Sequence, residues 1–158
     1  MRAAAGESFA YRSEIGRFSV DFPAASPSVR ELSGSKFSIT CNDVRHTVFA
    51  EGAEFAVEIH DIPRVAKLLL TSHYVLERSV KSMLEDIGAR EVDSVGVSVQ
   101  DQPAREVVFE IPDREFTGRL LSILAGRRLY LVSVRHPRSI DPPGAIEPFF
   151  ERFSFWLE

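Results

Sequence analysis

A β-hairpin across residues 115–136 constrains the fold more than any other stretch of this sequence. Two runs rich in apolar residues flank Ala125-Gly126, and glycine accepts the positive φ that a tight hairpin turn requires. The second arm is apolar on both sides of the pleat, where the alternating residues are Leu129, Tyr130, Leu131, Val132 and Val134. A strand of this kind must be covered on both faces, so we expect a sheet with a layer above it and a layer below it.

The remaining elements follow from hydrophobic periodicity. Alternating apolar residues predict strands at 9–11, 17–22, 36–41, 45–50, 54–60, 90–100 and 105–111. A proline- and serine-containing stretch at 24–35 is typical of a loop. Turns are predicted at Asn42-Asp43, Glu51-Gly52, 101–103 and 112–113. In strand 54–60, Phe55, Val57 and Ile59 should face the core, whereas Glu54, Glu58 and His60 should stay wet or meet polar cover.

Two helices are predicted. Apolar residues at helical spacing indicate one long helix from Pro63 to Gly88. Its apolar side comprises Val65, Leu68, Leu69, Leu76, Val80, Met83, Leu84 and Ile87. A short second helix should begin near 145–147, because Pro148 is tolerated only in a first turn. Its apolar stripe is Ile146, Phe149, Phe150 and Phe153, which would cover the second face of the hairpin.

These elements predict an α+β fold, a mostly antiparallel sheet sandwiched between one long helix and one short C-terminal helix. A chain of 158 residues is about one domain long. We therefore expect a single α/β domain over residues 9–158 after a flexible N-terminal arm at 1–8, which is small, polar and aperiodic.

Composition limits the classes of partner. The net charge of −4 argues against nucleic acid as the main partner. No apolar run is long enough for an integral membrane segment. The N-terminus lacks the apolar middle of a signal peptide, so the protein is cytoplasmic as given, or exported if a signal peptide was trimmed. The single cysteine, Cys41, is predicted to be a buried, inert core residue beside Phe37 and Ile39.

Four short phrases carry a resemblance to a known group. They are 18–23 (Phe-Ser-Val-Asp-Phe-Pro), 102–106 (Gln-Pro-Ala-Arg-Glu), 126–130 (Gly-Arg-Arg-Leu-Tyr) and 149–153 (Phe-Phe-Glu-Arg-Phe). With the element order, they resemble bacterial proteins of the α/β/α sandwich shared by the photosystem PsbP subunit and a yeast Ran-binding nuclear import factor. The resemblance covers most of the chain from Arg17 onward. It implies an accessory or protein-binding module and no shared catalytic site.

The titratable residues give no catalytic pattern. His60 and Asp61 would need a third ligand to hold zinc, and the carboxylate pairs Glu54/Glu58 and Glu106/Glu110 match a solvated strand face better than acid/base catalysis. A hydrolase would need a serine or Cys41 beside a histidine, which the chain order gives no reason to expect. We predict no metal and no cofactor.

The arginines are the candidate binding residues: Arg105, Arg119, Arg127, Arg128 and Arg135. They come from adjacent predicted strands and one turn, so they could gather into a site for carboxylates or phosphates. The alternative is that they pair with Glu106, Glu110, Asp113 and Glu115 of the same strands. The aromatic C-terminus, Phe153, Phe155 and Trp156, is predicted to close the core, with an exposed binding edge or a dimer-forming tail as the alternatives.

The sequence therefore favours a non-enzymatic accessory or protein-interaction module with a protein partner, compatible with a homodimer. The alternative function is a small-ligand or anion-binding protein that uses an arginine-lined cleft between the sheet and one helix.

Overall fold

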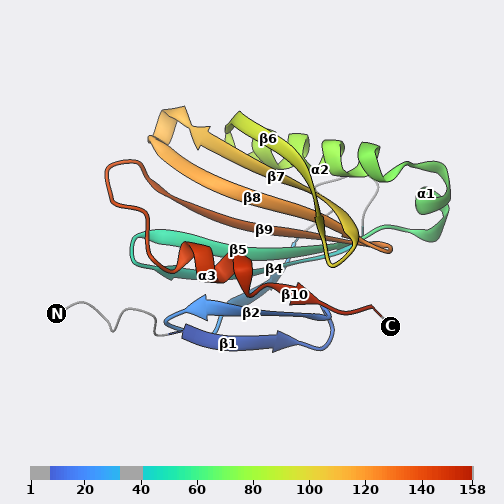
Figure 1. Ribbon diagram of the computed structural model, residues 1–158, viewed down its shortest axis with the longest axis horizontal. Coiled ribbons are helices and arrows are strands. Elements are labelled where there is room, and N and C mark those ends of the chain that lie inside the picture. Colours follow the sequence, from blue (N-terminus) through green and yellow to red (C-terminus); the bar gives the residue numbers. More distant parts are fainter. Residues whose placement is uncertain (1–7, 33–40, 158) are drawn as a thin grey trace.

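The computed structural model describes residues 8–32 and 41–157. In these residues a seven-stranded sheet has the order β3-β4-β5-β9-β8-β7-β6, and every neighbouring pair is antiparallel (Figure 1). Its strands are β3 (Ser28–Glu31), β4 (Cys41–Ala50), β5 (Ala53–Asp61), β6 (Arg90–Val99), β7 (Gln102–Ile111), β8 (Phe116–Ala125) and β9 (Arg128–Pro137). The predicted α+β class with a mostly antiparallel sheet is confirmed.

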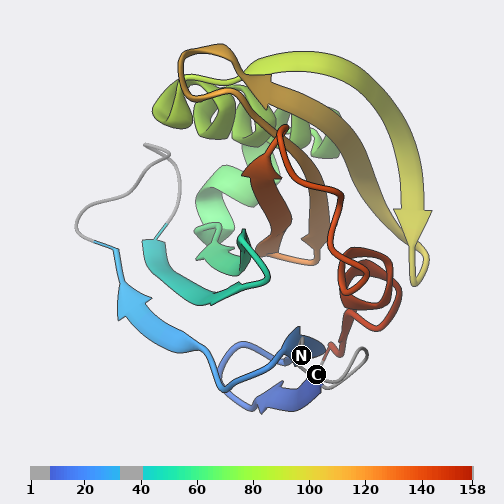
Figure 2. The same ribbon diagram turned by 90° about the vertical axis from the view of Figure 1, so that its left-hand side faces the viewer.

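Each face of this sheet carries its own layer (Figure 2). Helix α2 (Ser72–Ile87) covers one face over β7 and β8. Helix α3 (Ile146–Glu151) covers the other face together with a small sheet of order β1-β2-β10. The strands of the small sheet are β1 (Ser8–Ser13), β2 (Phe18–Pro23) and β10 (Ser154–Phe155). The short C-terminal helix thus lies where the sequence placed it, but it shares its face with a second sheet.

The hairpin β8–β9 is the centre of both layers. Gly126 in its turn has φ 64°, as predicted. Tyr130, Val132 and Val134 belong to the core under α3, and Leu129 and Leu131 to the core under α2. All five side chains are at most 2% exposed, so the prediction of a strand buried on both faces is confirmed.

The predicted long helix is two helices. Helix α1 (Arg64–Leu69) ends at Leu70, whose extended backbone breaks the helix. Thr71 then starts α2 by accepting a hydrogen bond on its side-chain oxygen from the backbone N–H of Tyr74 at 3.1 Å. The break turns α1 away from the sheet. Ala66 packs, partly buried, against the core under α2, and the larger apolar residues of α1 do not join it. No residue of α1 is buried, and Val65, Leu68 and Leu69 are 69%, 81% and 78% exposed.

Four further expectations differ from the structure. Part of the predicted loop 24–35 forms β3, and Asn42-Asp43 lies inside β4 at a bulge rather than in a turn. Pro103 lies in β7, so the turn before it contains only Gln100 and Asp101, both with positive φ. Cys41 is exposed and its Sγ lies 3.6 Å from the Asp61 carbonyl, so the prediction of a buried cysteine is wrong. Residues 36–40 of the predicted strand lie outside the described residues.

The end of the chain closes the core under α3. Phe153 and Phe155 are buried and contact Tyr130 with ring centroids 5.5 Å away in each case, as predicted, whereas Trp156 is half-buried. No helix in the described part of the chain is long and apolar enough to span a bilayer.

His46 of β4 is a buried histidine in this aromatic core. Its ring meets Phe18 edge-on at 5.0 Å, and its Nδ1 lies 3.2 Å from the Val57 carbonyl oxygen. Burial lowers the pKa of His46, and the hydrogen bond to Val57 offsets the effect only in part.

This lowered pKa predicts a pH-dependent stability. Below the ordinary histidine pKa of about 6.5 the unfolded chain takes up a proton that the folded His46 excludes, so the free energy of unfolding should fall as the pH falls. Urea unfolding of the wild type and of His46→Gln between about pH 7.5 and pH 5 measures how the free energy of unfolding depends on pH. The variant should show a shallower decline, and equal slopes would contradict the assignment.

Candidate functional site

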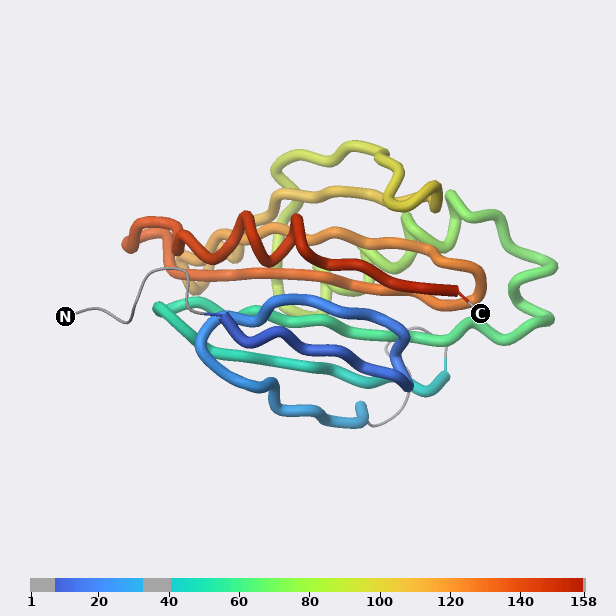
Figure 3. The backbone as a smooth tube through the Cα atoms, turned by 60° about the horizontal axis from the view of Figure 1, so that its bottom comes forward, coloured from blue at the N-terminus to red at the C-terminus, as the bar shows by residue number. Residues whose placement is uncertain are grey.

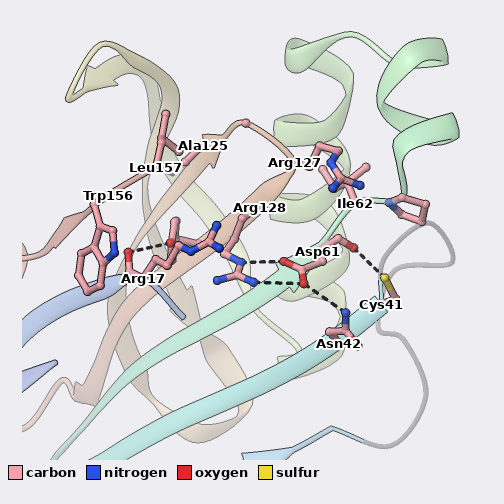
Figure 4. Close-up of a pocket in the computed structure, with 13 residues that line it drawn as sticks. Arg17, Cys41, Asn42, Asp61, Ile62, Ala125, Arg127, Arg128, Trp156 and Leu157 are labelled. Carbon is pink, nitrogen blue, oxygen red and sulfur yellow. Dashed lines mark hydrogen bonds and ion pairs between the residues drawn. The ribbon is translucent and has the colours of Figure 1, made fainter. Parts of the chain in front are cut away.

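A pocket of about 380 Å³ opens beside the turn of the β8–β9 hairpin (Figure 4). Residues from five separate parts of the chain line it, because the ends of β4, β5 and β9 meet there with the β1–β2 loop and the C-terminal segment. The lining residues are Arg17, Cys41, Asn42, Asp61, Ile62, Pro63, Ala125, Gly126, Arg127, Arg128, Tyr130, Trp156 and Leu157.

Arg128 and Asp61 form the polar floor of this pocket. Asp61 ends β5 directly opposite Arg128, the first residue of β9. The Arg128 guanidinium donates from Nε and Nη2 to the two Asp61 carboxylate oxygens at 2.7 and 3.2 Å, and from Nη1 to the Ile15 carbonyl at 2.7 Å. Such two-point pairing fixes the guanidinium plane. Burial alone would lower the pKa of Arg128, but the hydrogen bonds and charge of Asp61 outweigh it and raise that pKa.

Arg17 enters the pocket from a backbone conformation that few residues other than glycine adopt. Its φ is 55°, in the left-handed region that carries strain for an arginine. Its carbonyl accepts hydrogen bonds from the Tyr130 hydroxyl and from the Trp156 backbone N–H, both at 3.1 Å. These two bonds hold the strained residue from two elements far apart in sequence.

Tyr130 connects the pocket to the core. Its single hydroxyl proton is shared between two carbonyls, with the Gly16 oxygen at 2.6 Å and the Arg17 oxygen at 3.1 Å. Burial raises the pKa of Tyr130, although the charges of Arg128 and Arg17 lower it in part. The phenol therefore stays a protonated donor, and the ionised lining groups are three arginines against the single carboxylate of Asp61. The pocket is electropositive in a chain whose net charge is −4.

Exposed apolar side chains lie at the same end of the molecule as this basic pocket, and one of them, Leu157, lines it. Figures 1 and 3 place α1, the β1–β2 loop and the C-terminus at the same end of the molecule as the hairpin turn. We call this the hairpin-end surface. It comprises the basic residues Arg17, Arg127 and Arg128 and the exposed apolar residues Ile15, Val65, Leu68, Leu69 and Leu157. Ile15 is 85% exposed and Leu157 52% exposed.

Of the five predicted binding arginines, Arg127 and Arg128 line this pocket and the other three lie elsewhere. Arg105 reaches toward Glu77 of α2 at 3.5 Å, and Arg135 pairs with Glu54 at 3.1 Å. Arg119 lies on the α3 face, where it pairs with Glu106 and Glu147 and stacks on the Phe150 ring. Arg105 and Arg119 lie on opposite faces of the sheet, because alternate residues of a strand point to opposite faces. Arg119 and Arg128 share a face, but Arg119 lies opposite Val134, six residues along β9 from Arg128, so the five arginines do not form one cluster.

The predicted carboxylate pair Glu54 and Glu58 lies in a buried ionic network. Both bind the Arg45 guanidinium, and Glu58 is only 1% exposed. His60 is fully buried between two carboxylates, with Nδ1 2.6 Å from Asp43 and Nε2 2.9 Å from Glu58. The expectation of polar cover for this face of β5 is correct, but that of a solvated carboxylate pair is wrong.

His60 and Asp61 cannot share a metal. They are neighbours in β5 and bind on opposite faces, His60 in the ionic network and Asp61 in the pocket. The described residues contain no group of three or more histidine, cysteine, aspartate or glutamate side chains that could hold a metal ion.

Sequence reasoning missed Arg17, Asp61 and Trp156 as pocket residues. The sequence pattern places Arg17 in a strand, pairs Asp61 with His60 as a possible metal ligand and places Trp156 in the core. Their positions depend on how the β1–β2 loop and the C-terminal segment dock on the hairpin turn, and no local pattern in the sequence encodes that docking.

Comparison with known proteins bears on the fold. The structure is similar over 99% of its length to the solution structure of cyanobacterial PsbP (CyanoP) from Synechocystis sp. PCC 6803, covering 98% of that chain with a TM-score of 0.64 and 12% identity. The fold is PsbP-like. A Pseudomonas aeruginosa protein of unknown function, PA94, is similar with a TM-score of 0.50 and 12% identity, over 92% of this chain and 93% of that one. No family model and no curated protein matches the sequence.

The hydrogen bond from the Tyr130 hydroxyl to the β1–β2 loop predicts an effect on stability and on local hydrogen exchange. Tyr130→Phe removes a buried hydroxyl and leaves the Gly16 carbonyl without this donor, so we expect a loss of about 1 to 2 kcal/mol of stability. Hydrogen exchange should also become faster in the β1–β2 loop than in β8, because the loop loses a contact and β8 does not. Ser19→Ala, at a partly buried hydroxyl pair of β2 and β10, is the control. Uniform acceleration in both segments would contradict a local role.

Proposed function

We propose that this protein is a non-enzymatic accessory module that binds a protein partner through the hairpin-end surface. The observation that carries the proposal is helix α1, which has four apolar residues among six and buries none of them. Covering such a helix with another molecule removes apolar surface from water, and exposed apolar clusters rimmed by polar groups mark interaction sites.

Charge narrows the chemistry of the partner. Helix α1 begins directly after Pro63, which lines the pocket that contains three guanidinium groups and one carboxylate. Arg127 is exposed, and Arg64 and Lys67 of α1 add positive charge at the same end. A partner surface that presents aliphatic or aromatic side chains together with aspartate or glutamate would complement both the apolar residues and the positive charge of the hairpin-end surface.

The PsbP-like fold is compatible with an accessory role. The histidine contacts support a structural role for these residues. His46 and His136 place Nδ1 against backbone carbonyls, and His60 lies between the carboxylates of Asp43 and Glu58.

The test uses exposed positions so that the fold stays intact. Leu68→Asp and Arg127→Glu should each weaken binding to the partner by about tenfold or more, because central apolar and arginine contacts dominate interfaces. The partner is first captured by cross-linking from the native cells and then purified, and its dissociation constant is measured by calorimetry.

Matched controls lie at the other end of the molecule. Phe49→Asp also charges an exposed apolar residue, and Arg114→Glu also reverses an exposed arginine. Both should bind like the wild type. Equal losses in all four variants, binding of the wild type to phosphatidylglycerol vesicles instead of a protein, or steady turnover of a substrate by homogeneous protein would contradict the proposal.

A second candidate function is binding of a small anion in the same pocket. The supporting observation is that Arg17, Arg127 and Arg128 line one cavity of about 380 Å³ beside the Tyr130 hydroxyl. Guanidinium groups suit carboxylates and phosphates.

Thermal unfolding with phosphate, acetate and citrate separates the two candidates. A bound anion at about one hundred times its dissociation constant should add about 2.7 kcal/mol to the free energy of unfolding. Arg127→Gln should remove this gain and Leu68→Asp should keep it. If none of the anions stabilises the protein beyond a chloride control, the small-anion candidate is wrong and the protein-partner proposal is unaffected.

A further inference from the structure

Strand β6 is an unusually long and open edge of the seven-stranded sheet. It runs over ten residues, Arg90–Val99, and pairs only with β7 among the described strands. Figure 2 shows β6 at the outer rim of the sheet, with no ribbon beyond it. Val92 and Val95 are 57% and 52% exposed, and residues 94–99 carry no charge. Natural edges usually avoid this combination, because an open strand can pair with another chain.

The geometry of the β6–β7 turn identifies which backbone groups are open. Gln100 and Asp101 have φ of 49° and 65°, as in a two-residue type I′ turn, so Val99 and Gln102 form the first hydrogen-bonded pair. Alternation along the ladder then directs the N–H and C=O groups of Ser94, Gly96 and Ser98 away from β7. Two observations agree. Pro103, which has no N–H, lies opposite Ser98, and the Ser94 N–H is bound by the Asp93 carboxylate at 2.9 Å.

The sequence of this edge reads the same in both directions about Gly96. It is Ser94-Val95-Gly96-Val97-Ser98. An antiparallel pair of two identical strands with its two-fold axis at Gly96 places Gly96 opposite Gly96, Val95 opposite Val97 and Ser94 opposite Ser98. The groups of Ser94, Gly96 and Ser98 that point away from β7 meet their own counterparts in this register, where the Ser94 N–H exchanges the Asp93 carboxylate for the second copy. Valine pairs stabilise neighbouring strands. A closed two-fold contact of this kind needs one surface that complements itself.

We propose that two copies of this chain associate through β6, antiparallel about Gly96, to join their sheets into one. The partner is a second copy because the edge is self-complementary in backbone polarity, side chains and register. The shorter opposite edge, β3, has only four residues and carries Arg30 and Glu31, charges that oppose edge pairing. The contact is mostly a backbone ladder of modest area, so we expect a concentration-dependent dimer rather than an obligate one.

Gly96 gives a sharp test because it lies on the two-fold axis. A Cβ at Gly96 would meet no atom within 4 Å, so Gly96→Lys and Gly96→Glu fit the single chain. In the dimer each places two like charges opposite each other, which should weaken association by at least about tenfold. An equimolar mixture of the two variants places opposite charges there and should restore a dimer. Because Gly96 lies opposite Arg105 in β7, both variants are studied well below their unfolding temperatures.

Sedimentation equilibrium over a wide concentration range gives the readout. The wild type should rise from the 17.7 kDa of one chain toward twice that mass. Gly144→Lys is the matched control, since Gly144 is also an exposed glycine with open space around it, and it should dimerise like the wild type. The proposal is overturned if the wild type stays at the mass of one chain, if both Gly96 variants dimerise like the wild type, or if mixing them restores nothing.

Discussion

Burial of β9 on both faces is the constraint on which the rest of the structure depends. Leu129, Leu131 and their neighbours need α2, whereas Tyr130, Val132 and Val134 need α3 and the small sheet. One strand therefore requires two separate cores, and each core recruits a different part of the chain. On the α3 side, the Tyr130 ring contacts both Phe18 of β2 and Phe153 of the C-terminal segment, and its hydroxyl binds the Gly16 carbonyl of the β1–β2 loop.

The same strand creates the candidate site as a consequence of its register. Arg128 begins β9, two residues before Tyr130, so it shares the α3 face and emerges where the core ends. The hydroxyl of Tyr130 holds the β1–β2 loop, and the loop carbonyl of Ile15 then holds Arg128. The Tyr130 side chain therefore belongs to the core and also positions the residues of the positive pocket, so the pocket could not keep its shape if Tyr130 moved.

Periodic signals predicted most of the fold, and contacts between distant segments could not be predicted in the same way. The hairpin, the strands 90–100 and 105–111 and the short helix at Ile146 all follow from local alternation or helical spacing, and they are present. The spacing of Val65, Leu68 and Leu69 continues that of α2 and so predicts one helix, whereas the extended backbone at Leu70 divides it in two. The arginines were recognised as candidates, but their grouping depended on strand faces and on segments such as Arg17 that dock from far along the chain.

The β6 dimer and the hairpin-end surface have a defined relation in space. Ala104 of β7 lies opposite Ile123 of β8, so the β6–β7 turn is at the same end of the sheet as Gly126. A two-fold axis at Gly96 reverses the strand direction of the second copy. The two hairpin-end surfaces then face opposite ends of the joined sheet, while both α2 helices cover the same side of it. Such a dimer would leave both surfaces free, and two partners could bind at opposite ends with the added affinity of a bivalent contact wherever those partners are linked or fixed on one scaffold.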